Sequence, residues 1–169
     1  AQTGMSDIKN KSREDEGIPW LIKNSAGDKT SFSGPVSVPK NLQFIIQKYI
    51  ERPLLIHKRK FDIRVWVLIN QDMEVYFCKE GYLRLSAMEY RLDNCQNLYV
   101  HLTNNAIQKN AKEYGRFEDG NQMDFTQFQE YIDTKYPDRK VSVKDDIVED
   151  IKFIVAKTID SVKKKLDPH

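Results

Sequence analysis

Three charged side chains occupy alternate positions in one apolar segment of the sequence. Lys60, Asp62 and Arg64 alternate with Phe61 and Ile63 in the stretch KFDIR. Alternate residues of a β-strand point to the same face, so this spacing places the three charged groups side by side. The two cations of this set, Lys60 and Arg64, could bind a triphosphate or stabilise a developing acyl phosphate. The pattern also fits a solvent-facing strand with a salt bridge, and the spacing alone favours neither interpretation.

Two further groups could join the same cleft. Arg84 lies in a neighbouring predicted strand and could converge on the charged face. The stretch HLTN, residues 101–104, carries hydroxyl and amide groups that could face phosphate or ribose. Thr103 or Asn104 could instead cap a helix through residues 106–112, and composition alone favours that cap. His101 taken alone is more typical of a hydrogen-bonded histidine than of a catalyst.

Weaker candidates precede this region. The glycines of NSAGDKTSFSGP, residues 24–35, would let backbone amides approach phosphate oxygens. The stretch lacks an established phosphate-loop pattern, and its composition predicts a surface loop. An apolar predicted strand is interrupted by Gln47, Lys48 and Tyr49, and its edge backbone could pair with an adenine ring. Ordinary strands at a sheet margin show the same residue pattern.

Strands followed by helices must position these groups. Buried strands are predicted at residues 18–23 and 44–50, and an antiparallel meander at 60–70, 73–79 and 82–87, with turns at Gln71-Asp72 and Glu80-Gly81. Trp66 and Leu68 would continue the charged face as an apolar surface. Apolar residues at helical spacing predict helices at 124–136 and from Ser142, as the cap, to Leu166. This order predicts an α+β fold.

Composition restricts the remaining possibilities. The 169 residues are 40% hydrophobic, which suits one domain, with residues 1–17 as a disordered leader or a remnant introduced by cloning and residues 18–169 as the folded part. A net charge of +2 gives no basic excess for nucleic acid. Cys78 and Cys95 fit two reduced thiols. No apolar run reaches the roughly 20 residues of a membrane span, and nothing resembles a signal peptide, so we expect a soluble intracellular protein without membrane or nucleic-acid partners.

At these residues the sequence resembles the tubulin tyrosine ligase-like family, whose members have an ATP-grasp fold. The stretches that carry the resemblance are IQKYIERPLLI, RKFDIRVWVLI, EGYLRLS, VHLTNNAIQK and YGRFEDGNQM, within about residues 20–131. HLTN together with KFDIR is highly specific, because neither belongs to a generic nucleotide fold. The resemblance therefore favours a cleft over a surface salt bridge, and implies an ATP-grasp core of mainly antiparallel sheet with flanking helices.

The family's functional residues match individual positions of this chain. Asp62, Arg64 and Arg84 match catalytic positions, and Lys23 matches a strand-end lysine that contacts the ATP phosphates. The other positions implied to bind ATP are Gln47, Lys48, Tyr49, Ile50, Lys60, His101, Leu102, Thr103 and Asn104. The loop after Lys23 is shorter than is usual in the family. No metal ligand is expected in this chain, because the magnesium ligands of the family would follow His169.

The resemblance implies an ATP-dependent carboxylate–amine ligase that uses ATP and Mg²⁺. Such an enzyme would add tyrosine, glutamate or glycine to a carboxylate of a tubulin tail through an acyl phosphate. Its partners would be tubulin and a free amino acid, and its location the cytoplasm, on microtubules, with the cilium or basal body as candidates. We expect this chain by itself to be inactive. The alternative is a catalytically inactive module that binds nucleotide or tubulin.

Overall fold

The computed structural model describes the backbone of residues 20–24, 29–32 and 44–47, and all atoms of residues 48–93 and 95–166. Within these residues the chain has an α+β fold in which every strand pairing is antiparallel. The predicted fold class and the mainly antiparallel sheet are thus confirmed. The predicted leader at residues 1–17 lies outside the described residues.

The first sheet contains β1 (Trp20–Asn24), β2 (Lys29–Phe32) and β3 (Phe44–Lys48), in the order β2-β1-β3. The strand predicted at residues 18–23 is confirmed where it is described, and the one predicted at 44–50 is confirmed up to Lys48, where β3 ends. The predicted loop at 24–35 is wrong over β2, which pairs with β1 from Trp20 opposite Phe32 to Lys23 opposite Lys29. Lysine, serine and nearby glycine made the segment look like a loop, but pairing with β1 satisfies the backbone of KTSF.

The second sheet positions the charged residues. Its strands are β4 (Leu55–Ile56), β5 (Arg59–Arg64), β8 (Tyr82–Glu89) and β9 (Gln122–Asp124), in the order β4-β5-β8-β9. One face packs against α4 (Phe125–Lys135), which Asp124 caps in a reciprocal pair of hydrogen bonds with Gln127, so the predicted helix is confirmed. The buried core on this side contains Ile56, Leu83, Leu85, Met123, Phe128, Ile132 and Val143, with Phe61 and Ile63 packed against it.

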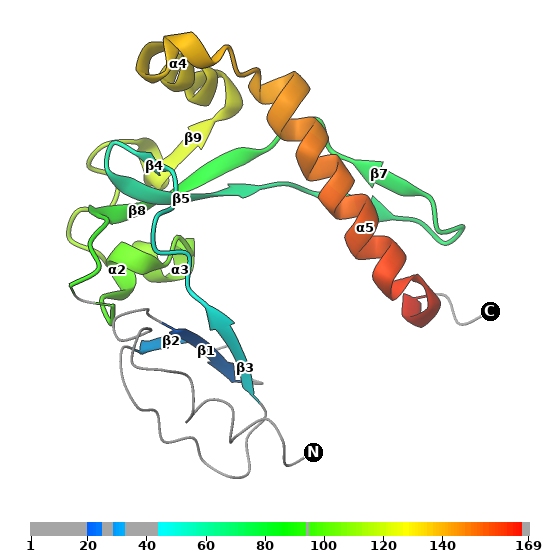
Figure 1. The fold of residues 1–169 in the computed structure, drawn as a ribbon, viewed down its shortest axis with the longest axis horizontal. Coiled ribbons are helices and arrows are strands. Elements are labelled where there is room, and N and C mark those ends of the chain that lie inside the picture. Colours follow the sequence, from blue (N-terminus) through cyan, green and yellow to red (C-terminus); the bar gives the residue numbers. More distant parts are fainter. Residues whose placement is uncertain (1–19, 25–28, 33–43, 94, 167–169) are drawn as a thin grey trace.

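The opposite face of this sheet is covered by two short helices, α2 (Leu98–His101) and α3 (Asn105–Gln108). Figure 1 shows the sheet between α4 on one side and α2 and α3 on the other. Because Phe61 and Ile63 face α4, strand alternation directs Lys60 and Asp62 towards α2 and α3. A short 3-10 turn, η2 (Asp119–Asn121), leads into β9.

The predicted meander is wrong in its connections. The segment 60–70 is not one strand: β5 ends at Arg64, and β6 (Val67–Ile69) pairs only with β7 (Val75–Phe77) in a separate ribbon. The turn at Gln71-Asp72 is confirmed, since the side chain of Asn70 accepts from the backbone N–H groups of Asp72 and Glu74. Trp66 and Leu68 are 46% and 64% exposed, so they do not extend the charged face as a cleft wall.

Gly81 marks a close approach of two chain segments rather than the predicted turn. β8 pairs with β5, not with β7, so the chain runs past Gly81 from one ribbon into the next sheet. A Cβ atom at Gly81 would lie 2.7 Å from the carbonyl oxygen of Arg64 and 2.7 Å from Cζ of Phe125. Only glycine fits between the backbone of β5 and the ring of Phe125 at this point.

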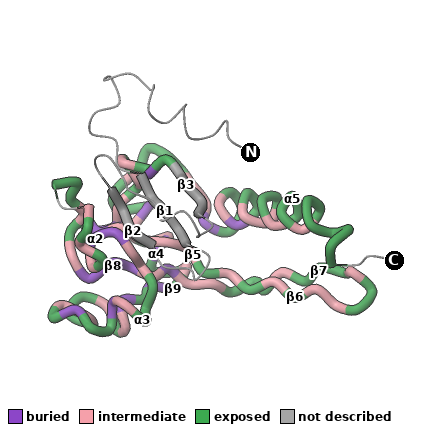
Figure 2. Tube along the Cα trace, turned by 90° about the horizontal axis from the view of Figure 1, so that it is seen from below, coloured by how far each residue is buried: buried purple, intermediate pink, exposed green. Residues whose placement is uncertain are grey.

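The C-terminal helix begins as predicted but packs differently. After the 3-10 turn η3 (Pro137–Arg139), Ser142 caps the π turn η4 (Val143–Ile147), and α5 (Val148–Leu166) continues to the end of the described chain. Only Val148 of α5 is buried, and Ile154 of its apolar stripe is 60% exposed. Figure 2 shows α5 and the β6–β7 ribbon as largely exposed elements beside each other. No described helix combines the length and apolar character needed to cross a membrane.

Candidate functional site

A cavity of about 260 Å³ lies on the face of the four-stranded sheet that carries α2 and α3. Its walls come from the residue after β3, from β5 and β8, and from the segment around α2. The lining residues are Tyr49, Lys60, Asp62, Arg84, Cys95, Leu98, His101, Leu102, Thr103 and Asn104. The fold therefore brings together most of the residues that the sequence singled out.

Asp62 and Arg84 form the charged wall of this cavity. They are direct partners in the β5–β8 register, and Nε of Arg84 donates to Oδ1 of Asp62 at 2.9 Å while Nη2 donates to Oδ2. The hydrogen bonds to Asp62 raise the pKa of Arg84 above its usual value, so the guanidinium stays charged. The carboxylate holds the guanidinium in one orientation on the cavity face.

Lys60 lies between two other walls. Its Nζ donates to the hydroxyl of Tyr49 at 3.0 Å and to the carbonyl oxygen of His101 at 3.0 Å. The hydroxyl of Tyr49 in turn lies 2.9 Å from Nδ1 of His101. The ammonium is thus held where the chain leaving β3 meets the C-terminal end of α2.

Aromatic rings surround His101 and connect it to the segment after β3. Tyr49 and Tyr90 both meet the imidazole edge-on, each with ring centroids 5.6 Å apart. The hydroxyl of Tyr90 donates to the carbonyl oxygen of Glu51 at 2.8 Å. Burial raises the pKa of Tyr49 well above its usual value, so this tyrosine is neutral at physiological pH. His101 is 4% exposed and is fixed on two sides.

The segment 101–104 forms the predicted helix cap and also lines the cavity, while its role towards phosphate or ribose stays a prediction. Oδ1 of Asn104 accepts from the backbone N–H of Ala106 at 3.0 Å and so caps α3, which ends at Gln108 rather than at Lys112. Asn104 and Thr103 nevertheless line the cavity. A helix cap and a cavity wall are therefore compatible roles for the same short segment.

Of the other predicted site residues, three lie outside the cavity lining and two have side chains outside the described part. Lys48 and Arg64 are exposed, Ile50 is 73% exposed, and none of the three lines the cavity. Lys23 and Gln47 lie in paired strands, opposite Ile45 and Leu21, and their side chains are outside the described part. The roles of these residues in catalysis and ATP binding stay predictions.

The sequence analysis missed two cavity residues, Cys95 and Leu98. Neither Cys95 nor Cys78 forms a disulfide within the described residues, and burial raises the pKa of Cys95. Both residues lie in a segment with no regular apolar spacing, so no sequence signal placed them in the cavity. Their position follows from the contact of α2 with β5 and β8.

The charges of the cavity suit a polyphosphate. Lys60 and Arg84 supply two cations, and Asp62, which Arg84 already binds, is the single carboxylate among the lining residues. The volume lies just below the roughly 300–1,000 Å³ of typical small-molecule pockets, which suits part of a nucleotide. The described residues include no group of His, Cys, Asp and Glu side chains that could hold a metal ion, and so do not by themselves fit a magnesium site.

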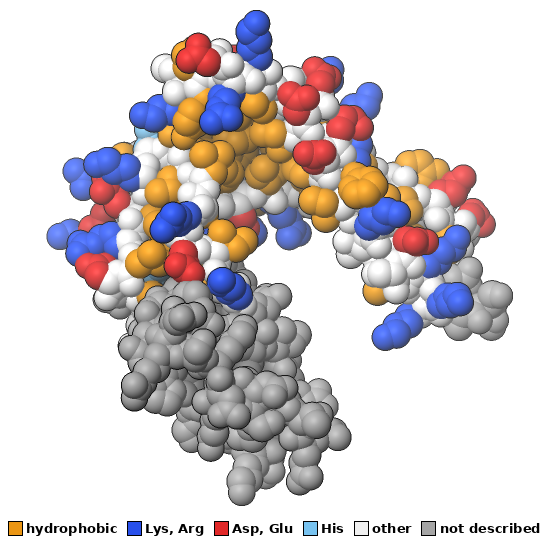
Figure 3. Space-filling view, viewed as in Figure 1, with side chains coloured by type: hydrophobic (Ala, Val, Ile, Leu, Met, Phe, Trp, Pro, Cys, Tyr) orange, Lys and Arg blue, Asp and Glu red, His pale blue; other side chains and the backbone are white. Residues whose placement is uncertain are grey.

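A larger hollow of about 400 Å³ lies between α5 and the β6–β7 ribbon and shares no residue with the first cavity. It is lined by Met73, Val75, Phe77, Lys152, Val155, Ala156, Ile159, Asp160 and Lys163. Figure 3 shows hydrophobic side chains gathered on the viewed face between α4 and α5, with charged side chains around them. The lining of this hollow includes two lysines and one aspartate, but none of the residues that the sequence analysis named as site candidates.

A family model and several named relatives match this chain. The model of the tubulin-tyrosine ligase family matches residues 2–168. The chain is 37% identical over 124 residues to tubulin glycylase 3B of Tetrahymena thermophila. This match covers 68% of this chain and 10% of that protein. It is 45% identical over 102 residues to tubulin glycylase 3A of Drosophila melanogaster, covering 57% of this chain and 10% of that protein.

A third relative is the protein monoglycylase TTLL8 of Homo sapiens, 43% identical over 96 residues, or 53% of this chain and 11% of that protein. The chain thus spans about a tenth of the length of these relatives. The family match extends over nearly the whole sequence, including the strands and helices that build the cavity. The chain belongs to the tubulin-tyrosine ligase family.

Proposed function

We propose that this chain forms part of the ATP site of a ligase that joins an amino acid to a carboxylate of a tubulin tail. The observation that carries the proposal is the single cavity in which Lys60, the Asp62–Arg84 pair and residues 101–104 meet. The family match and the antiparallel α+β fold support an ATP-grasp core around it.

The proposed chemistry needs positive charge at the reacting phosphoryl group. The carboxylate of the acceptor attacks the γ-phosphorus of ATP, the bond to the β–γ bridging oxygen breaks, and an acyl phosphate and ADP result. The amine of the amino acid then attacks the acyl carbon and phosphate leaves, with loss of one proton from the amine. Arg84, held in one orientation by Asp62, would stabilise the oxygens of the transferred group.

Lys60 and the aromatic groups have a different task in this proposal. The ammonium of Lys60 would bind phosphate oxygens, while Tyr49 and the carbonyl oxygen of His101 keep it in place. Thr103 and Asn104 line the same cavity and offer a hydroxyl and an amide for ribose or phosphate. The site is therefore organised before a ligand binds, which lowers the entropic cost of binding.

Among the three amino acids that the resemblance implies, we propose glycine. The relatives described above carry the names tubulin glycylase and protein monoglycylase. The proposed partners are the acidic tails of tubulin and free glycine, and a location on microtubules follows from that substrate.

The test is a ligation assay with the full-length protein, ATP, magnesium and tubulin, with glycine, tyrosine or glutamate supplied separately. Mass spectrometry of the tubulin tails should show the mass of added glycine, and little or no addition of the other two amino acids. Addition of tyrosine or glutamate alone would contradict the choice of glycine. ATP binding without any ligation would favour the inactive module, and absence of ATP binding would contradict the nucleotide site itself.

A further inference from the structure

Opposite Lys60, strand β8 contains a bulge. Arg59 pairs with Glu89 and Phe61 pairs with Leu85, so one residue of β5 faces three residues of β8. The backbone N–H of Lys60 donates to Oγ of Ser86 at 3.1 Å instead of to a carbonyl oxygen. Bulges re-aim side chains, and this one lies at the residue that supplies the ammonium of the cavity.

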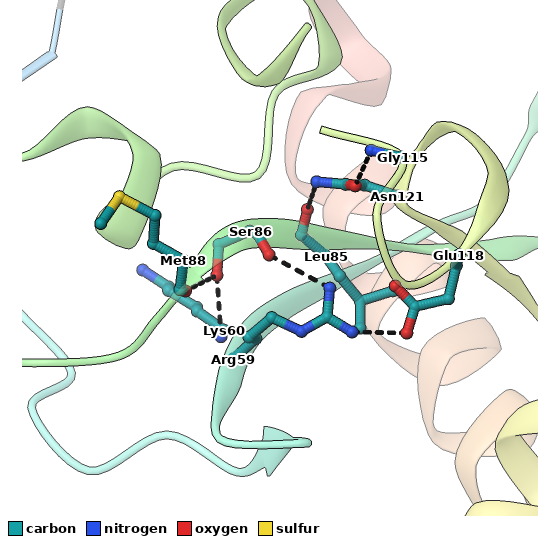
Figure 4. Close-up of polar contacts among 8 residues, drawn as sticks. All are labelled: Arg59, Lys60, Leu85, Ser86, Met88, Gly115, Glu118 and Asn121. Carbon is teal, nitrogen blue, oxygen red and sulfur yellow. Dashed lines mark hydrogen bonds and ion pairs between the residues drawn. The ribbon is translucent and has the colours of Figure 1, made fainter. Parts of the chain in front are cut away.

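Ser86 completes the ladder inside the bulge. Its side chain is fully buried, and its hydroxyl also donates to the carbonyl oxygen of Met88 at 3.0 Å. Figure 4 shows Ser86 between Lys60 and Met88, with Arg59 beneath it. The hydroxyl therefore replaces a backbone partner that the bulge removes.

A glutamine fixes the other side of the bulge. Oε1 of Gln108, in α3, accepts from the backbone N–H of Ala87 at 2.8 Å, and Nε2 donates to the carbonyl oxygen of Leu102. Gln108 is 1% exposed and does not line the cavity. One buried amide thus links the bulge behind Lys60 to the segment 101–104 on the facing wall.

The base of the bulge is anchored from a third direction. Nη1 of Arg59 donates to the carbonyl oxygen of Ser86 at 3.5 Å, and Nη2 forms an ion pair with Glu118. Asn121 donates to the carbonyl oxygen of Leu85 at 3.3 Å and accepts from the backbone N–H of Gly115 (Figure 4). These contacts tie the segment 115–121 to the strand on which the bulge occurs.

We propose that Ser86 and Gln108 are positioning residues that set the separation between Lys60 and the segment 101–104. The proposal rests on the nucleotide site proposed above. Loss of the Gln108 amide leaves the buried N–H of Ala87 and the partly buried carbonyl of Leu102 without this partner, and both relax by moving the two walls. A displacement of about 1 Å in a site that orients reacting groups lowers activity about 100-fold.

The chain offers a matched control in Gln129. In α4, its Oε1 accepts from the backbone N–H of Val143 at 2.7 Å and its Nε2 donates to the carbonyl oxygen of Val141 at 2.9 Å. Gln129 therefore makes the same type of bridge away from the cavity. Gln108→Met and Gln129→Met each remove a side-chain amide that bonds to two backbone groups outside its own helix, and both keep side-chain length.

The test compares ATP affinity and amide hydrogen exchange in the full-length protein carrying either substitution. Gln108→Met should weaken ATP binding at least about 10-fold and Gln129→Met less than about twofold. Without nucleotide, Gln108→Met should also speed exchange by about 10-fold or more at Ala87, whose N–H bonds to Gln108, and at Lys60, whose N–H bonds to Ser86 in the same bulge.

Equal effects of the two substitutions on ATP affinity, or unchanged exchange at Lys60 in Gln108→Met, would overturn the positioning role. If Gln108→Met does not fold, Ser86→Ala, which removes one hydroxyl, provides the second test. It should also speed exchange at Lys60, and it should weaken ATP binding by less than the factor expected for Gln108→Met. Failure of the unsubstituted protein to bind ATP would overturn the proposed function, and the exchange measurement would still decide the positioning role.

Discussion

Asp62 and Arg84 lie directly opposite each other on β5 and β8, and Nε and Nη2 of Arg84 both donate to the carboxylate of Asp62. The two residues are 22 positions apart in the sequence, with the whole β6–β7 ribbon between them. Strand register alone brings them together on the cavity face. The pair is therefore a consequence of the fold, and its orientation towards the cavity is what the proposed chemistry uses.

Asp62→Asn and Arg84→Lys should each lower ligation about 100- to 1,000-fold in the full-length protein. The first change removes the carboxylate that orients the guanidinium at the reacting phosphoryl group, and the second removes the guanidinium itself. The side chains are 38% and 24% exposed, so solvent screens the pair and the free energy of unfolding should fall by only about 1 kcal/mol or less. Turnover and chemical denaturation of the same samples measure the two effects.

The control for that pair is Arg91→Lys. Arg91 also donates through Nε and Nη2 to one aspartate, Asp93, but its side chain is 70% exposed and lies outside the cavity. Arg91→Lys should leave turnover unchanged. Equal losses in Arg84→Lys and Arg91→Lys would contradict a specific role for the Asp62–Arg84 pair.

Tyr49 should make the fold sensitive to alkaline pH. Burial raises its pKa in the folded chain, whereas the unfolded chain releases the proton near the ordinary pKa of 10.0. Above that pH the unfolded state binds fewer protons than the folded state, so the free energy of unfolding falls as pH rises.

The measurement is urea unfolding of the unsubstituted protein and of Tyr49→Phe at about pH 8 and above about pH 10. Tyr49→Phe should cost about 1 kcal/mol at the lower pH, because the hydroxyl bonds to Lys60 and His101 are lost. Its stability should then fall less steeply with pH. An identical pH dependence in the two proteins would show that Tyr49 does not contribute to the alkaline loss.

Gly81→Ala should destabilise the fold by about 1–3 kcal/mol, because the added methyl group would meet the backbone of Arg64 and the ring of Phe125. Gly81→Ala combined with Phe125→Leu should recover part of that loss, since the ring is one of the two obstacles. Thermal or denaturant unfolding measures both. If Gly81→Ala alone has the stability of the unsubstituted protein, the close packing of β8 against β5 and α4 is not as described.

The sequence predicted the local structure that depends on alternation and capping. The period of two in KFDIR placed Lys60 and Asp62 on one face, and the structure confirms that both line the cavity. The cap at Ser142 also formed as predicted. These features depend on a few neighbouring residues, which is why the sequence is sufficient.

Features that depend on distant contacts were not predictable in the same way. Gly81 is a residue type typical of turns, but in the structure its lack of a side chain leaves space for the ring of Phe125. Nothing near Gly81 in the sequence indicates this contact. The bulge opposite Lys60 contacts the side chain of Gln108, which accepts a hydrogen bond from Ala87 but comes from another element. Arg64 shares the spacing of Asp62 but is exposed, because β5 ends there.

The most direct test of a phosphate-binding cavity compares ATP with adenosine in calorimetric titrations of the full-length protein, Lys60→Met and Lys58→Met. Lys58 carries the same charge two residues away, but its side chain is 79% exposed and lies outside the cavity. Lys60→Met should weaken ATP about 10- to 100-fold and adenosine far less, because only ATP carries the charge that the ammonium neutralises. Lys58→Met should leave both affinities unchanged. Equal weakening of ATP and adenosine by Lys60→Met, or no ATP binding by the unsubstituted protein, would contradict the assignment of this cavity to the phosphates of ATP.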